Sequence, residues 1–299
     1  MANSRAGNLK TENSFPQGRL FQITDREFSA FRDLILREAG ISLSEGKRQL
    51  LCSRLAKRLR HFGFHTFSQY YDYLLTQDPK HEERLRMINC MTTNKTDFFR
   101  ESHHFNFLSQ HMIPQIRQRA FCGGVRKIRV WSAGCSSGEE PYSIAMTVRE
   151  ALGSLLGWDV KILASDIDTE MIRNGSDGIY AAERLSGVPY ELKRKHFLRG
   201  KGECEGYLQV HPELRDLVVF RRINLMDEPW PIHTYFDAIF CRNVVIYFNR
   251  ETQEKLFERL ATYLSEEGYL FVGHSENLSW LSHLFAPLRG TIYRRRKPG

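Results

Sequence analysis

The sequence lacks several features that would place it in a familiar class. None of its 299 residues belongs to an apolar run long enough to span a bilayer. The first 18 residues are polar and contain no apolar signal-peptide core. The six cysteines are scattered, and no C-x-x-C pair occurs, which argues against a zinc ribbon and a disulfide framework. We therefore expect a cytoplasmic protein with no membrane insertion, reduced thiols and no metal site.

Phosphate-binding fingerprints are also missing. No G-x-x-x-x-G-K-[ST] motif occurs, and Gly134 and Gly138 do not complete G-x-G-x-x-G. They lie in the stretch IRVWSAGCSSGEEPYSIA, residues 128–145, whose pattern is a strand, a turn of small residues, two acids and a helix. This pattern is typical of the first βα turn of a nucleotide-binding fold, but an ordinary βα connection explains the stretch alone equally well. Because Glu139 and Glu140 would repel a phosphate, the turn favours a ligand with positive charge.

The charge is strongly unbalanced. The chain has a formal net charge of +8, which predicts an acidic partner: a nucleic acid, an acidic membrane or an acidic protein surface. Much of this charge lies on a predicted helix at about residues 45–62, where Glu45 is the only acid. A solvated basic face is the usual explanation for such a helix. We nevertheless expect it to dock an acidic partner, through Lys47, Arg54, Lys57 and Arg58.

The chain divides into two regions that differ in their pattern of predicted helices and strands. Residues 1–20 are polar and predict a disordered tail. Residues 21–91 contain four helical patterns and no strand pattern, beginning at a capping box, and predict an all-α N-terminal domain. Residues 92–127 follow as a linker segment and a helix. From 128 to 299 strands and helices alternate, which predicts an α/β domain with a parallel sheet. An insertion at about 179–222 interrupts the rhythm.

The insertion is predicted to be a small antiparallel β subdomain. Extended runs at Tyr207–Val210 and Leu217–Arg222 flank its loops. The second run leads into Asn224, which we expect at the end of a strand of the larger sheet.

Polar residues follow several predicted strands of the α/β domain. They are the 132–140 turn, Asp166, Asn224, and Asn243 with Tyr247. Parallel strands place such groups together at the carboxyl edge, where open α/β sheets bind ligands, and an acid after the second strand binds ribose hydroxyls. S-adenosylmethionine fits this set because it carries a sulfonium, an ammonium and a ribose. NAD fits less well because its pyrophosphate would meet the two acids.

Five blocks of the chain resemble the chemotaxis receptor glutamate methyltransferases of the CheR type. The resemblance covers roughly residues 22–294 and keeps the order of the family's signatures, TTNKTDFFRESHHF, WSAGCSSGEEPYSIAM, ASDIDTEMI, FDAIFCRNVVIYF and GHSENL. It implies a class I (Rossmann-like) methyltransferase domain at 128–299, with the small antiparallel β subdomain, preceded by the all-α domain. It also implies methyl transfer from S-adenosylmethionine to a receptor glutamate, which yields a methyl ester and S-adenosylhomocysteine.

The resemblance assigns site residues position by position. Arg100 and Tyr247 match the residues nearest the transferred methyl. The matching cofactor contacts are Asn94, Thr96, Arg100, Glu140, Asp166, Asn224, Leu225, Asn243 and Val244. A glutamate with a pKa of about 4.3 is already ionised at neutral pH, so the reaction needs no general base. Arg100 would orient that carboxylate, and Tyr247 would pack or hydrogen-bond beside the sulfonium or, alternatively, be a core aromatic.

The resemblance also implies the partners. They are the cytoplasmic helices of methyl-accepting chemotaxis receptors and, from the form of loop 200–206, a receptor C-terminal peptide added as a strand to the β subdomain. We expect a monomer. Two other functional classes fit parts of the sequence. A nucleic-acid amine methyltransferase would suit the charge, but the Asn243–Tyr247 run lacks the Pro-Pro of that class. A non-catalytic binding protein would not need Arg100, Glu140 and Tyr247 together.

Overall fold

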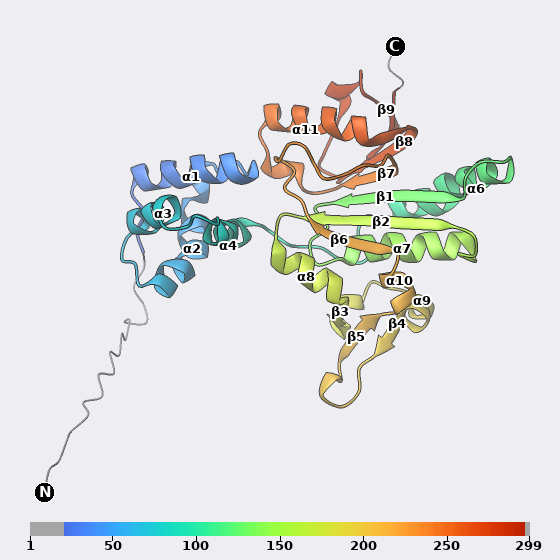
Figure 1. Ribbon diagram of the computed structural model, residues 1–299, viewed down its shortest axis with the longest axis horizontal. Helices are drawn as coiled ribbons and strands as arrows, with labels where there is room; N and C mark the ends of the chain where they lie inside the picture. Colours follow the sequence, from blue (N-terminus) through green and yellow to red (C-terminus); the bar gives the residue numbers. More distant parts are fainter. Residues whose placement is uncertain (1–20, 297–299) are drawn as a thin grey trace, which may run out of the picture.

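The computed structural model describes residues 21–296, so the predicted tail at 1–20 lies outside the described part. A helical part comes first in the chain and a large mixed sheet follows it, with a small three-stranded sheet inserted between two strands of the large one (Figure 1). This architecture confirms the predicted combination of an all-α region with an α/β domain that carries a small antiparallel subdomain. In residues 21–296 no helix is both long and apolar enough to cross a membrane.

The helical part consists of α1 (Asp25–Ala39), α2 (Arg48–Phe62), α3 (Phe67–Thr76) and α4 (Glu82–Met91), with a 3-10 turn at Glu45–Lys47 before α2. The predicted capping box is confirmed, since the Thr24 side chain accepts a hydrogen bond from Glu27 N. Helix α1 ends at Gly40, whose φ of 71° favours glycine. Helix α2 buries Leu51, Leu55 and Leu59 in the core of this part.

The large sheet has seven strands in the order β6-β2-β1-β7-β8-β10-β9. The first five run parallel, and β10 pairs antiparallel with both β8 and β9. In sequence order the strands are β1 (Lys127–Ala133), β2 (Asp159–Asp166), β6 (Val218–Arg222), β7 (Phe236–Cys241), β8 (Leu264–Val272), β9 (Phe285–Arg289) and β10 (Ile292–Arg295).

Helices cover both faces of this sheet. Ile128 and Val130 of β1 pack into one core cluster with α5 (His103–Phe107), α6 (Ile113–Phe121) and α7 (Glu139–Leu152). Trp131 points to the other face and joins the cluster of α11 (Arg250–Tyr263). A π-helical turn at Leu108–Met112 separates α5 from α6.

The small sheet has the order β3-β5-β4, from β3 (Ile179–Ala181), β4 (Phe197–Arg199) and β5 (Tyr207–Val210), and all its pairs are antiparallel. The placement of Leu217–Arg222 in this subdomain is wrong. Residues 218–222 form β6, which pairs parallel with β2 at the edge of the large sheet. An extended pattern shows that a segment is a strand but not which strand it pairs with, so the error is one of partner and not of secondary structure.

Candidate functional site

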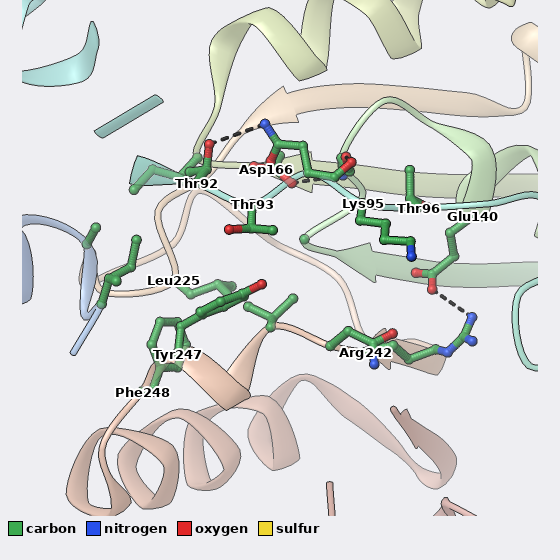
Figure 2. A pocket seen from close by; sticks show the side chains of 18 of the residues that line it. Thr92, Thr93, Lys95, Thr96, Glu140, Asp166, Leu225, Arg242, Tyr247 and Phe248 are labelled. Atoms are coloured by element: carbon green, nitrogen blue, oxygen red, sulfur yellow. Dashed lines mark hydrogen bonds and ion pairs between the residues drawn. The ribbon is translucent and has the colours of Figure 1, made fainter. Parts of the chain in front are cut away.

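A cavity lies between the helical part and the carboxyl edge of the large sheet. Its wall includes Ala39 and Ile41 at the end of α1 as well as the ends of β1, β2, β6 and β7. Figure 2 shows Lys95, Thr96 and Glu140 on one side of it and Tyr247 with Leu225 on the other. The structure brings together all ten predicted catalytic and cofactor residues in this wall: Asn94, Thr96, Arg100, Glu140, Asp166, Asn224, Leu225, Asn243, Val244 and Tyr247.

The first βα turn is tied to the end of β2. Gly134 has a φ of 83°, and a Cβ there would lie 2.3 Å from Cγ2 of Val244, so only glycine lets the turn approach the loop after β7. Ser136 N donates to Asp166 Oδ2 at 2.8 Å, and Asp168 N donates to the other carboxylate oxygen at 3.0 Å. Each carboxylate oxygen of Asp166 therefore keeps a lone pair that can accept a hydrogen bond from a ligand in the cavity. Burial raises the pKa of Asp166, and these backbone donors oppose the rise.

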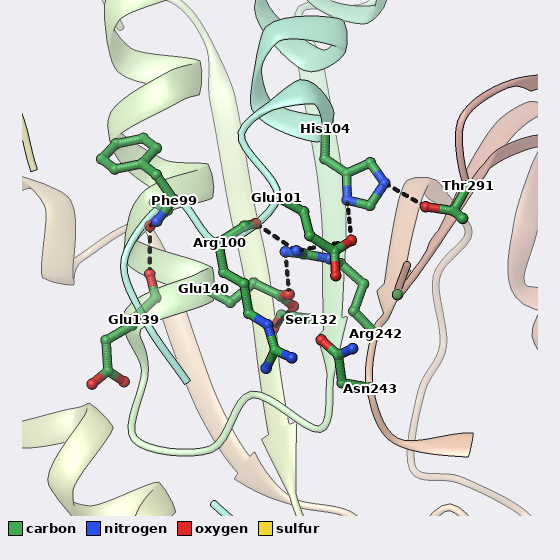
Figure 3. A network of polar contacts seen from close by, with 12 residues as sticks. Phe99, Arg100, Glu101, His104, Ser132, Glu139, Glu140, Arg242, Asn243 and Thr291 are labelled. Atoms are coloured by element: carbon green, nitrogen blue, oxygen red, sulfur yellow. Dashed lines mark hydrogen bonds and ion pairs between the residues drawn. The ribbon is translucent and has the colours of Figure 1, made fainter. Parts of the chain in front are cut away.

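Glu140 is the acid of the turn that lines the cavity. It accepts hydrogen bonds from Ser132 Oγ at 2.7 Å and from Arg242 Nη1 at 2.9 Å. Burial raises the pKa of Glu140, and Arg242 acts against that shift. Arg242 itself is buried and also donates to the carbonyl of Arg100 (Figure 3). Arg242 was not among the predicted site residues, although it stands beside Asn243 in the same sequence block.

Glu139, the first acid of the turn, does not line the cavity, whereas Glu140, which the resemblance assigned to the cofactor, does. The side chain of Glu139 is fully buried and forms an ion pair with Arg184, on the 3-10 turn Ala182–Leu185 of the small subdomain. Ser137 Oγ also donates to it, at 2.7 Å. Of the two acids, the one that reaches the cavity is therefore Glu140. No local pattern reveals the partner of Glu139, since Arg184 lies 45 residues further along the chain.

The segment after α4 closes the cavity from the helical side. Asn94 Nδ2 donates to Asp168 Oδ2 at 2.8 Å, and the carbonyl of Asn94 accepts from Ser136 Oγ at 3.1 Å. The side chain of Arg100 donates one hydrogen bond, to the carbonyl of Lys95 at 3.1 Å. Among residues 21–296 no carboxylate forms an ion pair with Arg100, so most of its guanidinium donors stay available for a bound group.

The side chain of Asn224 is engaged within the protein. Its Nδ2 donates to the carbonyl of Glu38 at 2.7 Å and to Asp227 Oδ1 at 3.1 Å, and its Oδ1 accepts from Met226 N at 3.0 Å. Asn224 thus joins α1 to the loop after β6. Any contribution to ligand binding comes from its position in the cavity wall more than from a free amide group.

Asn243 has a φ of 59°, which is uncommon outside glycine. Glu276 holds this conformation, because its carboxylate accepts from Asn243 N at 3.0 Å and from Gly273 N. A Cβ at Gly273 would lie 2.4 Å from Asn243 Nδ2. The GHSENL block therefore supports the loop after β7. The sequence resemblance contained this block but assigned it no role.

Tyr247 ends the 3-10 turn Val245–Tyr247 after β7. Its carbonyl accepts from Ser42 N at 2.8 Å, which joins this turn to the helical part. The ring is half-buried at the border of two hydrophobic clusters, and its hydroxyl points toward the middle of the cavity (Figure 2). This position suits both a packing role and a hydrogen bond to a ligand.

Two of the four predicted docking cations are committed to internal contacts. Arg58 forms a bidentate pair with Glu83, with 2.7 Å between Nε and Oε1, and Glu83 is buried. Arg54 donates to the carbonyls of Met91 and Thr92 at 2.7 and 2.8 Å. Helix α4 and the residue after it therefore supply internal partners for Arg54 and Arg58 that are distant in sequence. Lys47 and Lys57 are exposed, as predicted.

Glu101, His103 and His104 bring three ligand-type atoms within 4.8 Å of one another, the arrangement found in metal sites. The guanidinium of Arg242 already lies 3.4 Å from Glu101 Oε2 (Figure 3). A metal ion here would meet the repulsion of that arginine, so the group is better described as a polar network.

Comparison with known proteins places both parts of the chain in one family. Residues 26–92 match the model described as CheR methyltransferase, all-alpha domain, and residues 94–294 match CheR methyltransferase, SAM binding domain. The chain is similar to chemotaxis protein methyltransferase 2 of Pseudomonas aeruginosa, with 45% identity over 91% of this chain and 94% of the relative. It is also similar to the chemotaxis protein methyltransferase of Escherichia coli, with 42% identity over 92% of each chain.

Proposed function

The chain belongs to the CheR methyltransferase family, and we infer from this that it transfers a methyl group from S-adenosylmethionine to glutamate side chains of chemotaxis receptors. The products are a glutamate methyl ester and S-adenosylhomocysteine. The observation that carries the inference is one cavity that combines a largely buried carboxylate at the first βα turn, an acid after β2 and an arginine without an acidic partner among residues 21–296.

The residues of the cavity fit S-adenosylmethionine chemically. Glu140 offers a carboxylate to the ammonium of the methionine part, and Asp166 offers lone pairs to the ribose hydroxyls. A group of apolar side chains offers a surface for the adenine: Ala39, Ile41, Met91, Ile167, Ile223, Leu225 and Phe248. We propose that Thr96, Asn224, Asn243 and Val244 complete this site, with Asn94 holding the covering segment to Asp168.

The chemistry needs positioning and no proton transfer. S-adenosylmethionine supplies a methyl group on a sulfonium, whose leaving group is an uncharged thioether. An oxygen of the substrate carboxylate forms the new O–C bond with one of its lone pairs, and the electrons of the S–C bond go to sulfur. The ionised glutamate becomes a neutral ester, so both charges disappear in the step. Because the nucleophile is already a carboxylate, the protein contributes by alignment and by excluding water.

Arg100 and Tyr247 are proposed to carry out this alignment. The free donors of Arg100 can hold the substrate carboxylate in a fixed plane through one oxygen while the other attacks. A full bidentate pair would weaken the nucleophile, so Arg100 acts on orientation. Tyr247 presents its ring and hydroxyl at the cavity centre (Figure 2), where it would border the reacting methyl.

The receptor would approach the cavity beside α2. We propose that the exposed Lys47 and Lys57 contact the acidic, glutamate-bearing helices of the receptor, while Arg54 and Arg58 shape the helical part. The small sheet offers a second contact, since β3 and β4 are both its edges and a receptor C-terminal peptide can add a strand to one of them. Titration with such a peptide tests this tether, and no binding at high micromolar concentration would remove it.

Calorimetric binding tests the cofactor part of the proposal. The protein should bind S-adenosylhomocysteine, and NAD should not compete, because its pyrophosphate would meet Glu140 at the first βα turn. Competition by NAD at equal concentration, or no heat with S-adenosylhomocysteine, would contradict the proposed site.

A further inference from the structure

The segment that covers the cavity has a strained backbone. Phe99 and Glu101 have φ values of 54° and 58°, a region that bulky L-residues rarely adopt. Such a conformation is strained, and it persists only where the surroundings hold it in place. Thr96 and Arg100, two of the proposed site residues, flank Phe99. Whatever holds this strained segment therefore also sets the position of groups that face the cofactor and the substrate.

Helix α7 provides the fixed support for this segment. In the middle of the segment, Phe99 N donates to Ser143 Oγ of α7 at 3.0 Å (Figure 3). At each end of the segment, an arginine from elsewhere in the chain bridges a carbonyl of the segment to an acid at the start of α7. Arg242 links the carbonyl of Arg100 to Glu140 at the inner end.

Arg184 forms the corresponding bridge at the outer end. Its Nη2 donates to the carbonyl of Thr96 at 3.1 Å and pairs with Glu139. The ion pair with Glu139 raises the pKa of the Arg184 guanidinium, which stays charged. Phe98 strengthens the same contact, since its ring lies 5.0 Å from Tyr180 and 5.7 Å from Phe197, both of the small subdomain. The subdomain thus reaches the wall of the cavity through Arg184.

We propose that Arg184 is a positioning residue for the methyl transfer, the outer half of a clamp whose inner half is Arg242. It holds the Thr96 carbonyl against Glu139, and so keeps the segment 96–101 in the shape that presents Thr96 to the cofactor and Arg100 to the substrate. This inference rests on the proposed function, because it assigns Arg184 to the same cavity. It also gives the small subdomain a role in the active site that is separate from any peptide it binds.

A set of variants separates positioning from simple charge balance. Arg184→Met removes both contacts and leaves Glu139 buried without its cation, which lowers stability. Arg184→Met combined with Glu139→Gln also removes the buried charge. The melting temperature should then recover, while the Thr96 carbonyl still lacks its hydrogen bond from Arg184. Arg184→Lys keeps the charge and should recover part of the function. The matched control is Arg194→Met, since Arg194 pairs with Glu191 on the surface of the same subdomain.

The readouts are the calorimetric Kd of S-adenosylhomocysteine, kcat, KM and the melting temperature of the full chain. For the double variant we expect a wild-type melting temperature, a Kd weaker by roughly tenfold, the scale of one charge-assisted hydrogen bond, and a lower kcat. Arg194→Met should match the wild type. A double variant with wild-type Kd and kcat would overturn the proposal and reduce Arg184 to a counter-ion. Failure of the wild type to bind S-adenosylhomocysteine would instead contradict the proposed function.

Discussion

Glu139 and Glu140 are consecutive in the sequence, yet their carboxylates pair with different arginines and face different parts of the protein. Glu139 is fully buried against Arg184 of the small subdomain. Glu140 pairs with Arg242 at 2.9 Å and lines the cavity. One helical turn therefore contains an acid that holds the structure together and an acid that meets the ligand.

Glu140→Gln should weaken binding of S-adenosylhomocysteine by roughly tenfold, because a charge-assisted contact to the ligand's ammonium becomes a neutral one. Glu139→Gln should change the Kd by less than about threefold, since the glutamine oxygen still accepts from Arg184. Isothermal titration at neutral pH measures both. Equal effects of the two substitutions would contradict the division of roles.

His104 should make the stability of the protein fall in mild acid. Its ring is buried, and burial together with the neighbouring Arg242 lowers the pKa of His104 from 6.5 to about 2. Below pH 6.5 the unfolded chain binds a proton that the folded chain does not, so stability is complete above that pH and is lost as the pH falls. The expected slope is about 1.4 kcal/mol per pH unit from this residue.

Urea unfolding of the wild type, His104→Gln and His103→Gln at several pH values measures this slope. His104→Gln should be less stable at neutral pH but should lose less stability on acidification. His103→Gln, at an exposed neighbour that is the smallest of the three causes lowering the His104 pKa, should keep most of the wild-type slope. If the free energy of unfolding changed with pH by the same slope in the wild type and in His104→Gln, His104 would not be the group that causes the loss of stability.

Arg58→Ala should destabilise the helical part by about 3 kcal/mol, because it leaves the carboxylate of Glu83 buried without its bidentate partner. The control is Lys57→Ala, because Lys57 directly precedes Arg58 and its side chain is exposed. This substitution should change stability by about 0.5 kcal/mol or less. Chemical denaturation measures both. A small effect of Arg58→Ala would mean that Arg58 is not needed for stability and is available for docking the receptor.

Lys57→Glu should raise KM for the receptor and leave the Kd of S-adenosylhomocysteine unchanged.

Arg100→Lys should lower kcat strongly, on the order of a hundredfold, because an ammonium keeps the charge but loses the planar fork that orients a carboxylate. Single-turnover methylation of a receptor fragment at saturating cofactor measures the effect on the chemical step. Tyr247→Phe serves as a comparison that preserves the ring and removes only the hydroxyl. A wild-type rate for Arg100→Lys would mean that Arg100 supplies charge without orientation.

Local signals in the sequence predicted many, though not all, of the helices and strands that the structure contains. The Thr24 capping box, for example, depends on residues only three positions apart. The convergence of strand ends follows from the parallel topology, and the structure indeed places Asp166 and Asn243 in one wall. These inferences hold because each rests on neighbouring residues or on a general property of parallel sheets.

Pairings between distant residues were not predictable in this way. Glu83 lies 25 residues after Arg58, and Glu140 lies 102 residues before Arg242. Which side chain meets which depends on how helices pack and on which strands are neighbours. For the same reason Leu217–Arg222 was assigned to the wrong sheet, and no local sequence pattern indicates the contact of Arg184 with the cavity wall.

The transfer of a radiolabelled methyl group tests the central claim most directly. The protein would be incubated with labelled S-adenosylmethionine and either a receptor cytoplasmic fragment or RNA, and each product would then be treated with base. The account predicts label on the receptor fragment that base releases, as expected for a glutamate methyl ester, and none on RNA. Label on RNA, or base-stable label on the receptor, would contradict it.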